Sequence, residues 1–226
     1  MPLSIDSKGN SKAISSNQTE PHKHLTAVVQ KHLAHRFQKP IQAHTQQAFE
    51  QVNAIVAQFQ GAIILDACCG VGQSTRILAK QNPLALVIGI DKSASRIERQ
   101  VEDVWGAENY VLVRADLNDF YRLLQAANWP ISHHYVLYPN PWPKSKHLQR
   151  RWHGSAVFPD MLKLGEQMIL RSNWLLYLQE FQQAAVIAGV TGEISLVDDA
   201  QPLTPFEAKY KASGQQCWQL ALTLNS

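Results

Sequence analysis

The sequence is poor in cysteine. Its 226 residues include three cysteines, Cys68, Cys69 and Cys217, and two of these are adjacent. A disulfide framework or a cysteine metal site needs cysteines at characteristic spacings, which this arrangement does not provide. The sequence therefore favours a reduced compartment, and we predict no metal site.

Long apolar runs are also missing. No stretch is long enough to span a bilayer, and residues 1–20, rich in Ser, Asn and Lys, lack the apolar centre of a signal peptide. We expect a cytoplasmic protein without a membrane partner, present as a monomer or weak homodimer, with residues 1–20 as a disordered tail. With 45% hydrophobic residues, the chain can bury the core of one α/β domain.

Acidic residues are missing from two stretches, 21–49 and 120–159, although the formal net charge is only +3. The basic residues in these stretches are Lys23, Lys31, Arg36, Lys39, Arg122, Lys144, Lys146, Arg150 and Arg151. Such a local excess of positive charge is the expected footprint for a phosphate backbone. A solvated surface without a partner is the alternative interpretation.

Apolar runs and helical periodicity alternate along most of the chain. Strands are expected at 62–66, 85–90, 110–114, 135–138, 167–170, 193–197 and 216–224. Helices are expected at 25–33, 41–59, 76–81, 93–104, 117–126, 161–164 and 175–188. This alternation predicts an α/β fold with a doubly wound, mostly parallel Rossmann-like sheet and helices on both faces. We expect a helical extension at 21–60 and a single domain at 61–226.

Polar residues and glycines follow the predicted strands, where a doubly wound sheet binds its ligands. These residues are Asp66, Gly70, Gly72, Asp91, Asp116, Asn140 and Asn173. Glycines let the backbone approach a ligand closely. An acid after the second strand can accept hydrogen bonds from two ribose hydroxyls. The arrangement predicts a nucleoside-binding site, with a tight turn beside incidental acids as the alternative.

A stiff loop follows the fourth predicted strand. Three prolines within five residues end that strand and leave the backbone little freedom around Asn140 and Trp142. The basic residues Lys144, Arg150 and Arg151 come directly afterwards. Trp142 is expected to stack on a base, because the prolines on either side disfavour packing in the core. The loop is suited to placing a polyanion against a reacting centre.

Two sequence motifs carry a resemblance to a known family. Asp66-Ala-Cys-Cys-Gly-Val-Gly72 resembles the first motif of S-adenosylmethionine-dependent methyltransferases, with Cys68 where a further glycine is common. Tyr138-Pro-Asn-Pro-Trp-Pro-Lys144, followed by His147 and the two arginines, resembles the Phe-Pro-Asp-Pro-Trp-x-Lys-x-x-His-x-x-Arg-Arg signature of tRNA (guanine-N7)-methyltransferases. The first motif is generic, whereas the second is specific.

A third match lies near the C-terminus, where Thr204-Pro-Phe-Glu207 resembles that family's Thr-x-Phe-Glu segment. The resemblance implies a class I methyltransferase that binds S-adenosylmethionine and tRNA. Asp66, Gly70, Gly72, Asp91, Asp116 and Asn140 would then contact the cofactor. Trp142, Lys144, Arg150, Arg151, Asn173, Thr204, Phe206 and Glu207 would contact the substrate, with Asn140 at the reaction centre.

The sequence departs from the family pattern at two of these positions. Asn140 and Asn173 each stand where the family has an aspartate. Guanine N7 carries a lone pair and no proton, so methyl transfer to it needs no general base. An asparagine can still orient the base, but losing a charged hydrogen bond costs about 1.5–3 kcal/mol. Slow guanine-N7 methylation is the preferred expectation.

Two alternatives follow from the same departures. Asn140-Pro141-Trp142 is similar to the Asn-Pro-Pro-aromatic motif of methyltransferases that act on exocyclic amines, in RNA or in a small molecule. The loss of both aspartates is also compatible with a degenerate relative that binds RNA or S-adenosylmethionine without turnover.

Overall fold

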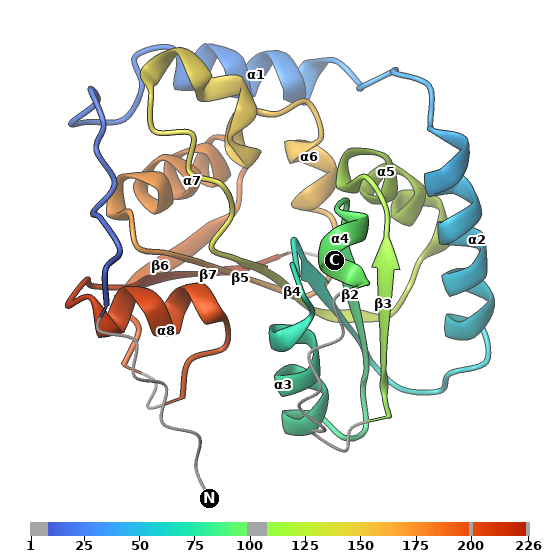
Figure 1. Cartoon of the computed structure of the whole chain (residues 1–226). Coiled ribbons are helices and arrows are strands. Elements are labelled where there is room, and N and C mark those ends of the chain that lie inside the picture. Colours follow the sequence, from blue (N-terminus) through green and yellow to red (C-terminus); the bar gives the residue numbers. More distant parts are fainter. Residues whose placement is uncertain (1–8, 99–107, 199–200, 225–226) are drawn as a thin grey trace, which may run out of the picture.

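The computed structural model describes residues 9–98, 108–198 and 201–224, which form a seven-stranded sheet between two layers of helices (Figure 1). The strands are β1 (Ile63–Ala67), β2 (Leu86–Asp91), β3 (Tyr110–Arg114), β4 (Ile131–Leu137), β5 (Gln167–Ser172), β6 (Thr191–Leu196) and β7 (Trp218–Thr223). Their order is β3-β2-β1-β4-β5-β7-β6, and β7 runs antiparallel to both of its neighbours. The other neighbouring strands pair in parallel. The predicted doubly wound, mostly parallel α/β fold is confirmed.

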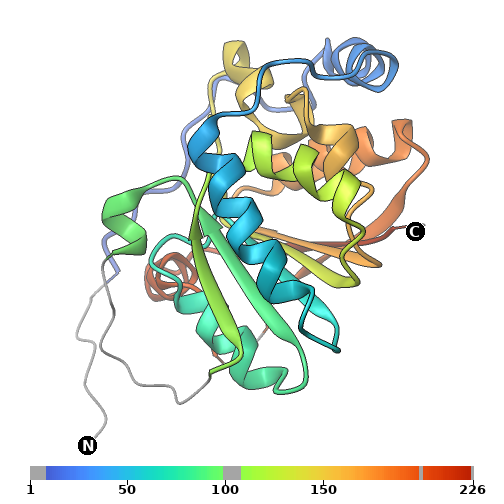
Figure 2. The same cartoon turned by 90° about the vertical axis from the view of Figure 1, so that its right-hand side faces the viewer.

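Helices cover both faces of this sheet. The helices are α1 (Leu25–Ala34), α2 (Ala43–Val56), α3 (Gln73–Gln81), α4 (Ala94–Ile97), α5 (Leu117–Ala127), α6 (Phe158–Met161), α7 (Leu175–Ile187) and α8 (Pro205–Ala212). Figures 1 and 2 show α5, α6 and α7 on one side of the sheet and α3 and α8 on the other. In the extension, α1 packs against α6 and α7, and α2 packs against α5 and against β3 of the sheet. No helix in the described part of the chain is both long and apolar enough to cross a membrane.

The strands β1 and β2 are apolar on both faces over most of their length, and this places them inside the molecule. Ile63 and Leu65 of β1 belong to the larger core cluster, which α5 and α7 help to form. Ile64, between them, belongs to a smaller cluster with Leu78 of α3. Successive side chains of a strand point to opposite faces, so a run of apolar residues needs helices on both sides. In β1 and β2 the polar residues Asp66 and Asp91 therefore lie at or next to the carboxyl ends of the strands.

Residues 9–22 differ from the expected disordered tail. They form an extended segment, here called the N-terminal strap, that runs from the end of α8 towards α1 (Figure 1). Near α8, the backbone N–H of Ser11 donates to the side chain of Ser213, 3.1 Å away. Farther along, the Ser16 hydroxyl donates to the carbonyl of Pro143, and Gln18 contacts Glu180. Hydrogen bonds rather than apolar burial hold the strap, which explains why its composition resembles that of a disordered segment.

Several elements differ from their expected bounds for local reasons. α6 begins at Phe158, ahead of the expected 161–164, with a proline in its first turn. α8, which was not predicted as a helix, begins after Thr204 and also has a proline in its first turn. Two short 3₁₀ helices, η1 (Ser145–Arg150) and η2 (Trp152–Gly154), occupy the basic stretch. The helix expected at 93–104 begins with α4, and its second half lies outside the described residues. The domain boundaries at residues 20 and 60 stay a prediction.

Candidate functional site

The predicted strand-end residues lie along one edge of the sheet, at the carboxyl ends of the parallel strands. Ala67, near the end of β1, pairs with Ile90 of β2 on one side and with Val136 of β4 on the other. The chain continues from β1 towards β3 in one direction and from β4 towards β5 in the other. The junction of β1 and β4 is therefore the switch point, where an open α/β sheet binds its ligand.

A glycine-containing loop follows β1 at this switch point. Cys68, Gly70 and Gly72 have left-handed backbone conformations, with φ of 62°, 61° and 77°. An added Cβ at Gly70 would meet no atom within 4 Å, so the loop borders open space there. An added Cβ at Gly72 would lie 2.7 Å from the methyl groups of Leu112, and its φ of 77° strains any residue other than glycine. Cys68 adopts a conformation that favours glycine, the residue common at this position of the motif.

Asp66 lies fully buried beneath the glycine loop. The hydroxyls of Ser74 and Thr75 donate to its Oδ2 at 2.6 and 2.7 Å. Its Oδ1 has no hydrogen-bond partner among the described residues. Burial raises the pKa of Asp66 to about 6, the two hydroxyls lower it, and the charge of Asp91 adds to the rise. A positively charged group of a ligand would satisfy both the free oxygen and the buried charge.

Asp91 and Asp116 are held in place by backbone N–H groups. Asp91 accepts from the N–H of Gly70 at 3.2 Å and from the N–H of Ser93 at 2.8 Å. Asp116 accepts from the N–H of Asn118 at 2.8 Å and thereby caps α5. A carboxylate has about four lone-pair sites, so these contacts fix both side chains and leave room for ligand hydroxyls.

The proline-rich loop after β4 exposes Asn140 beside this edge. The Oδ1 of Asn140 accepts from the N–H of Trp142 at 3.3 Å, which turns the amide oxygen towards its own loop. Trp142 has a left-handed backbone, with φ of 44°. The guanidinium of Arg150 lies 4.7 Å from the centre of the Trp142 ring, and the ring of His147 meets it edge-on. Trp142 is thus braced by its own segment at the surface.

The two adjacent arginines of the basic stretch have different environments. Arg150 is exposed, as is Lys144. Arg151 is fully buried, and its guanidinium forms an ion pair with the equally buried Glu180. It also donates to the carbonyls of Trp142 and Lys144. The resemblance implied that Arg151 contacts the substrate. In the structure its N–H groups bond to a buried carboxylate and to loop carbonyls, so Arg151 is not presented to a phosphate backbone.

The segment that resembles the family's nucleotide-holding motif is also used by the fold. The Thr204 hydroxyl accepts from the N–H of Glu207 at 3.0 Å and caps α8. Glu207 is fully buried and pairs with Arg171 and Lys211, each at 3.2 Å. Phe206, by contrast, is 51% exposed. The resemblance implied that Thr204, Phe206 and Glu207 contact the substrate. Of these three residues, only Phe206 is exposed to solvent.

Asn173, after β5, lies next to this segment. Its Nδ2 donates to Oε1 of Gln215 at 2.9 Å, and Gln215 in turn donates to the carbonyl of Ser11 in the N-terminal strap. The side chain at this position is therefore linked by hydrogen bonds to both the end of α8 and the strap.

Residues 60–220 match the model of a protein family described as putative methyltransferases, which spans well over half of the chain. The chain belongs to this family. Within it, the chain is similar to proteins named tRNA (guanine-N7)-methyltransferase. It is 28% identical to the Aquifex aeolicus protein over 64% of this chain and 50% of that protein. It is 26% identical to the Mycoplasma genitalium protein over 49% of this chain and 51% of that protein. It is also 26% identical to the Nitrosococcus oceani protein over 74% of this chain and 73% of that protein.

This methyltransferase-family chain spans about half the length of the Aquifex and Mycoplasma relatives. Solved structures share its fold. The 16S rRNA methyltransferase KamB superposes with a TM-score of 0.56 at 18% identity, over 84% of this chain and 99% of that chain. The antibiotic-resistance methyltransferase Kmr gives 0.55 at 16% identity, over 79% and 93%. The shared fold is the Rossmann-like methyltransferase sheet.

Sequence reasoning missed several residues that hold the site residues in place. Ser74 and Thr75 bond to Asp66, and their position just after the glycines was the available signal. Glu180 was missed as the partner of Arg151, although a lone acid on the buried face of α7 between Leu176 and Ala184 marks it.

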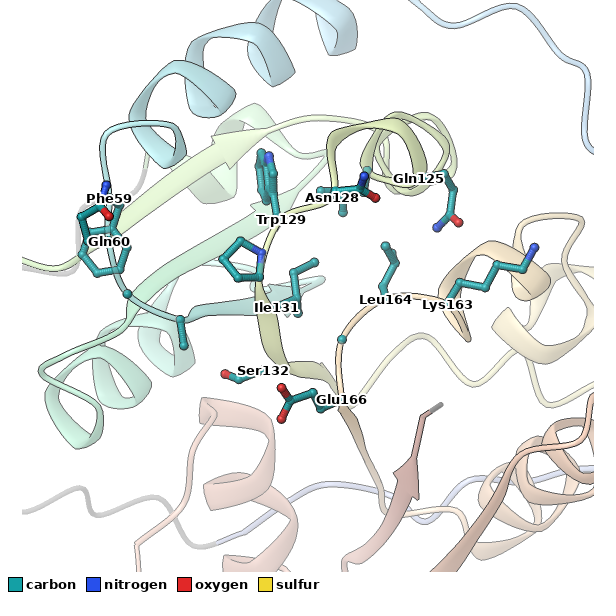
Figure 3. A pocket seen from close by; sticks show the side chains of 15 residues that line it. Phe59, Gln60, Gln125, Asn128, Trp129, Ile131, Ser132, Lys163, Leu164 and Glu166 are labelled. Atoms are coloured by element: carbon teal, nitrogen blue, oxygen red, sulfur yellow. The ribbon is translucent and has the colours of Figure 1, made fainter. Parts of the chain in front are cut away.

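A cavity of about 770 Å³ lies at the opposite edge of the sheet (Figure 3). Its wall comes from the segments that precede β1, β4 and β5, including Gln60, Trp129 and Glu166. None of the predicted site residues lines it. The carboxyl edge remains the candidate site because the strained glycine loop and the unpartnered Asp66 oxygen lie there.

Proposed function

We propose that this protein is an S-adenosylmethionine-dependent methyltransferase that methylates guanine N7 in tRNA. The observation that carries the proposal is the pairing of β1 with β4, which brings the glycine loop and the Asn140 loop side by side. One loop would hold the methyl donor and the other the methyl acceptor. The names of the relatives supply the substrate, tRNA, and the modified atom.

The residues after β1, β2 and β3 fit S-adenosylmethionine. The free Oδ1 of Asp66 lies beneath the loop and suits a cationic group, and Gly70 leaves space above it. Asp91 has lone pairs for the ribose hydroxyls, and Asp116 lies beyond it at the start of α5 for the adenine side. The cofactor supplies a methyl group on a positively charged sulfur.

Methyl transfer to guanine N7 suits a site without a general base. Bound S-adenosylmethionine would supply an activated methyl group to the N7 lone pair, with Asp66, Asp91 and Asp116 as the residues that would hold it. The chain's part is to orient the base, and proximity and orientation supply up to about 7–11 kcal/mol in favourable systems. Asn140 is exposed at the switch point, where its Nδ2 group can donate to the guanine.

Exposed basic side chains would hold the tRNA backbone near this loop. Lys144, Lys146 and Arg150 are exposed on the segment that follows Asn140. Each neutralised phosphate releases counterions, so binding through them should weaken as salt rises. A cytoplasmic location, and a monomer or weak homodimer as the working form, belong to the same proposal.

Methylation of an exocyclic amine is the second candidate function, and the Asn140-Pro141-Trp142 sequence favours it. It requires the asparagine oxygen to accept a hydrogen of the amine. That oxygen already accepts from the N–H of Trp142 and keeps one lone pair for an amine, whereas the N7 reaction needs no acceptor at this position. A relative that binds its ligands without turnover is the third candidate.

Transfer of labelled methyl from S-adenosylmethionine to tRNA that lacks 7-methylguanosine, followed by nucleoside analysis, tests the proposal. We expect labelled 7-methylguanosine. Label in another nucleoside would favour the exocyclic-amine reaction, and binding of both ligands without label would favour the relative without turnover.

Two variants separate the cofactor side from the substrate side. Asp91→Ala should weaken S-adenosylmethionine binding about 10- to 100-fold, because hydrogen bonds to a charged group are worth about 1.5–3 kcal/mol. Unchanged affinity, measured by calorimetry, would contradict the nucleoside site. Asn140→Asp should raise the rate of transfer, since a carboxylate stabilises positive charge that develops on the purine. Loss of activity in Asn140→Asp would show that the amide itself is required.

A further inference from the structure

A buried carboxylate outside the proposed site joins the N-terminal strap to the basic stretch. Glu180 of α7 accepts from Nε2 of Gln18 at 2.5 Å and from the N–H of His22 at 2.8 Å, both through Oε1. Its Oε2 accepts from Arg151 and from Nε2 of His153, the latter at 3.1 Å. Four donors from two distant segments therefore converge on one side chain.

Arg151, which pairs with Glu180, also donates hydrogen bonds to the loop that carries Asn140. Its Nε and Nη2 donate to the carbonyl of Trp142 at 3.2 and 3.1 Å. Trp142 has a left-handed backbone, which persists in a residue other than glycine when the surrounding structure enforces it. The paired donors of Arg151 provide that enforcement, and the Trp174 ring supports the guanidinium at 5.0 Å.

The N-terminal strap holds the same loop from a second side. The Ser16 hydroxyl donates to the carbonyl of Pro143 at 2.5 Å. The side chain of Asn17 accepts from the N–H of Ser145 at 3.1 Å and lies 3.3 Å from its hydroxyl. The prolines at 139, 141 and 143 lack N–H groups, so the loop has few donors of its own beyond the N–H of Trp142, which bonds to Asn140. The carbonyls of Trp142 and Pro143 instead accept from Arg151 and Ser16.

We propose that Glu180 is a positioning residue for the transfer reaction, acting with the N-terminal strap. It orients Arg151, which fixes the carbonyl of Trp142 and thereby the direction in which Asn140 faces the carboxyl edge of the sheet. Gln18 bridges the ion pair, since its Oε1 accepts from Arg151 at 3.2 Å while its Nε2 donates to Glu180. This inference rests on the proposed function for its kinetic consequence, and on the hydrogen bonds alone for its structural one.

The full-length chain with Gln18→Ala tests the proposal, and Thr19→Ala is the matched control. Gln18 is partly buried and loses its contacts to both charged partners, whereas Thr19 is the exposed neighbour. Hydrogen exchange of the amides at 142 and 144–147 reports the loop directly. Transfer kinetics report its consequence, because misplacing a group by about 1 Å costs up to about 100-fold in rate.

For Gln18→Ala we expect faster exchange in the loop, with exchange in β1 and α3 unchanged. We expect kcat about tenfold lower with an unchanged KM for S-adenosylmethionine, and Thr19→Ala like the wild type. Glu180→Gln, which keeps the shape and removes the charge, should change the same amides and kcat further. Unchanged loop exchange in Gln18→Ala would overturn the proposal, and so would an equal rise throughout the domain. If the wild type transfers no methyl to tRNA, the proposed function fails, and the exchange measurement decides this inference alone.

Discussion

Two buried carboxylates, one in each half of the molecule, have opposite environments. Asp66, in the β1–β2 half, meets the hydroxyls of Ser74 and Thr75 and has one oxygen without a partner among the described residues. Glu180, in the half that carries the basic stretch, meets an arginine and three further donors. Burial alone would raise the pKa of Glu180, but the hydrogen bond from His153 and the charge of Arg151 bring it to about 2.

The two residues differ in what satisfies their charge and hydrogen bonds. Asp66 still needs a partner, which a ligand can supply, whereas the partners of Glu180 all come from the protein itself. Asp66 has unused hydrogen-bond capacity and a charge without an opposite charge, which is the condition in which a buried group gains most from a cationic ligand. Glu180 has no such need. The two adjacent arginines differ in the same way. The guanidinium of Arg151 is paired with Glu180 inside the protein, whereas that of Arg150 is exposed and can contact a phosphate.

The largest loss of stability should come from breaking the buried ion pair between Arg151 and Glu180. Arg151→Ala leaves Glu180 buried without its arginine, and removing one partner of a buried ion pair costs about 3–5 kcal/mol. Urea unfolding followed by circular dichroism should record this loss in the free energy of unfolding. A loss below about 1 kcal/mol, the range of exposed pairs, would place Arg151 among the surface residues after all.

The second effect concerns Asp66 and depends on pH. Its pKa rises from 3.8 to about 6 on folding, so the folded state holds the proton more tightly than the unfolded state between these values. This residue's contribution to stability is therefore full below about pH 4 and is lost as the pH rises through about 6. The rise corresponds to about 3 kcal/mol.

Comparing the wild type with Asp66→Asn isolates this contribution. The free energy of unfolding of the wild type should fall relative to that of the variant between pH 4 and 6. S-adenosylmethionine should bind the wild type more tightly as the pH rises through about 6, and the variant should lack this dependence. Parallel stability curves would show that Asp66 has an ordinary pKa and is not the buried charge that a ligand completes.

The smallest effect on stability should come from Arg150→Ala. Arg150 is exposed and lies over Trp142, a contact worth about 0.5–1 kcal/mol. Its effect on RNA should be distinct: tRNA binding weakens, and the slope of log K against log salt falls by about one. Filter binding at several salt concentrations measures this slope, and an unchanged slope would remove Arg150 from the interface.

The half of the site around β1 could be predicted from the sequence because its signals are local. A strand that ends in an acid, followed by glycines, places Asp66, Gly70 and Asp91 at one edge whatever the rest of the chain does. The strand from 110 to 114 was even predicted with its observed bounds. Parallel pairing then brings these local features together.

The other half could not be predicted in the same way because its contacts are distant. Nothing in Arg150-Arg151 reveals which guanidinium turns inward, since the deciding acid, Glu180, comes 29 residues later. Thr204 and Glu207 have the spacing of a helix-capping pair, but on the basis of the resemblance they were interpreted as contacts to the substrate. The strap makes no apolar contribution to the core clusters, so its hydrophobicity carries no signal.

The strap also imposes an order of events during synthesis. Ser11 is made early, yet its partners Ser213 and Gln215 lie 202 and 204 residues farther along the chain. Segments that contact each other over such separations close late in folding, because the entropy of the intervening loop must first be lost. The parallel strands β1 to β5 can assemble as the chain emerges, whereas β6 must wait for β7 and the Ser11 end of the strap must wait for residues 213–215. Ser16 and Asn17, which hold the loop around Asn140, contact residues 143 and 145, so the earliest segment of the described chain can shape this loop before α8 is made.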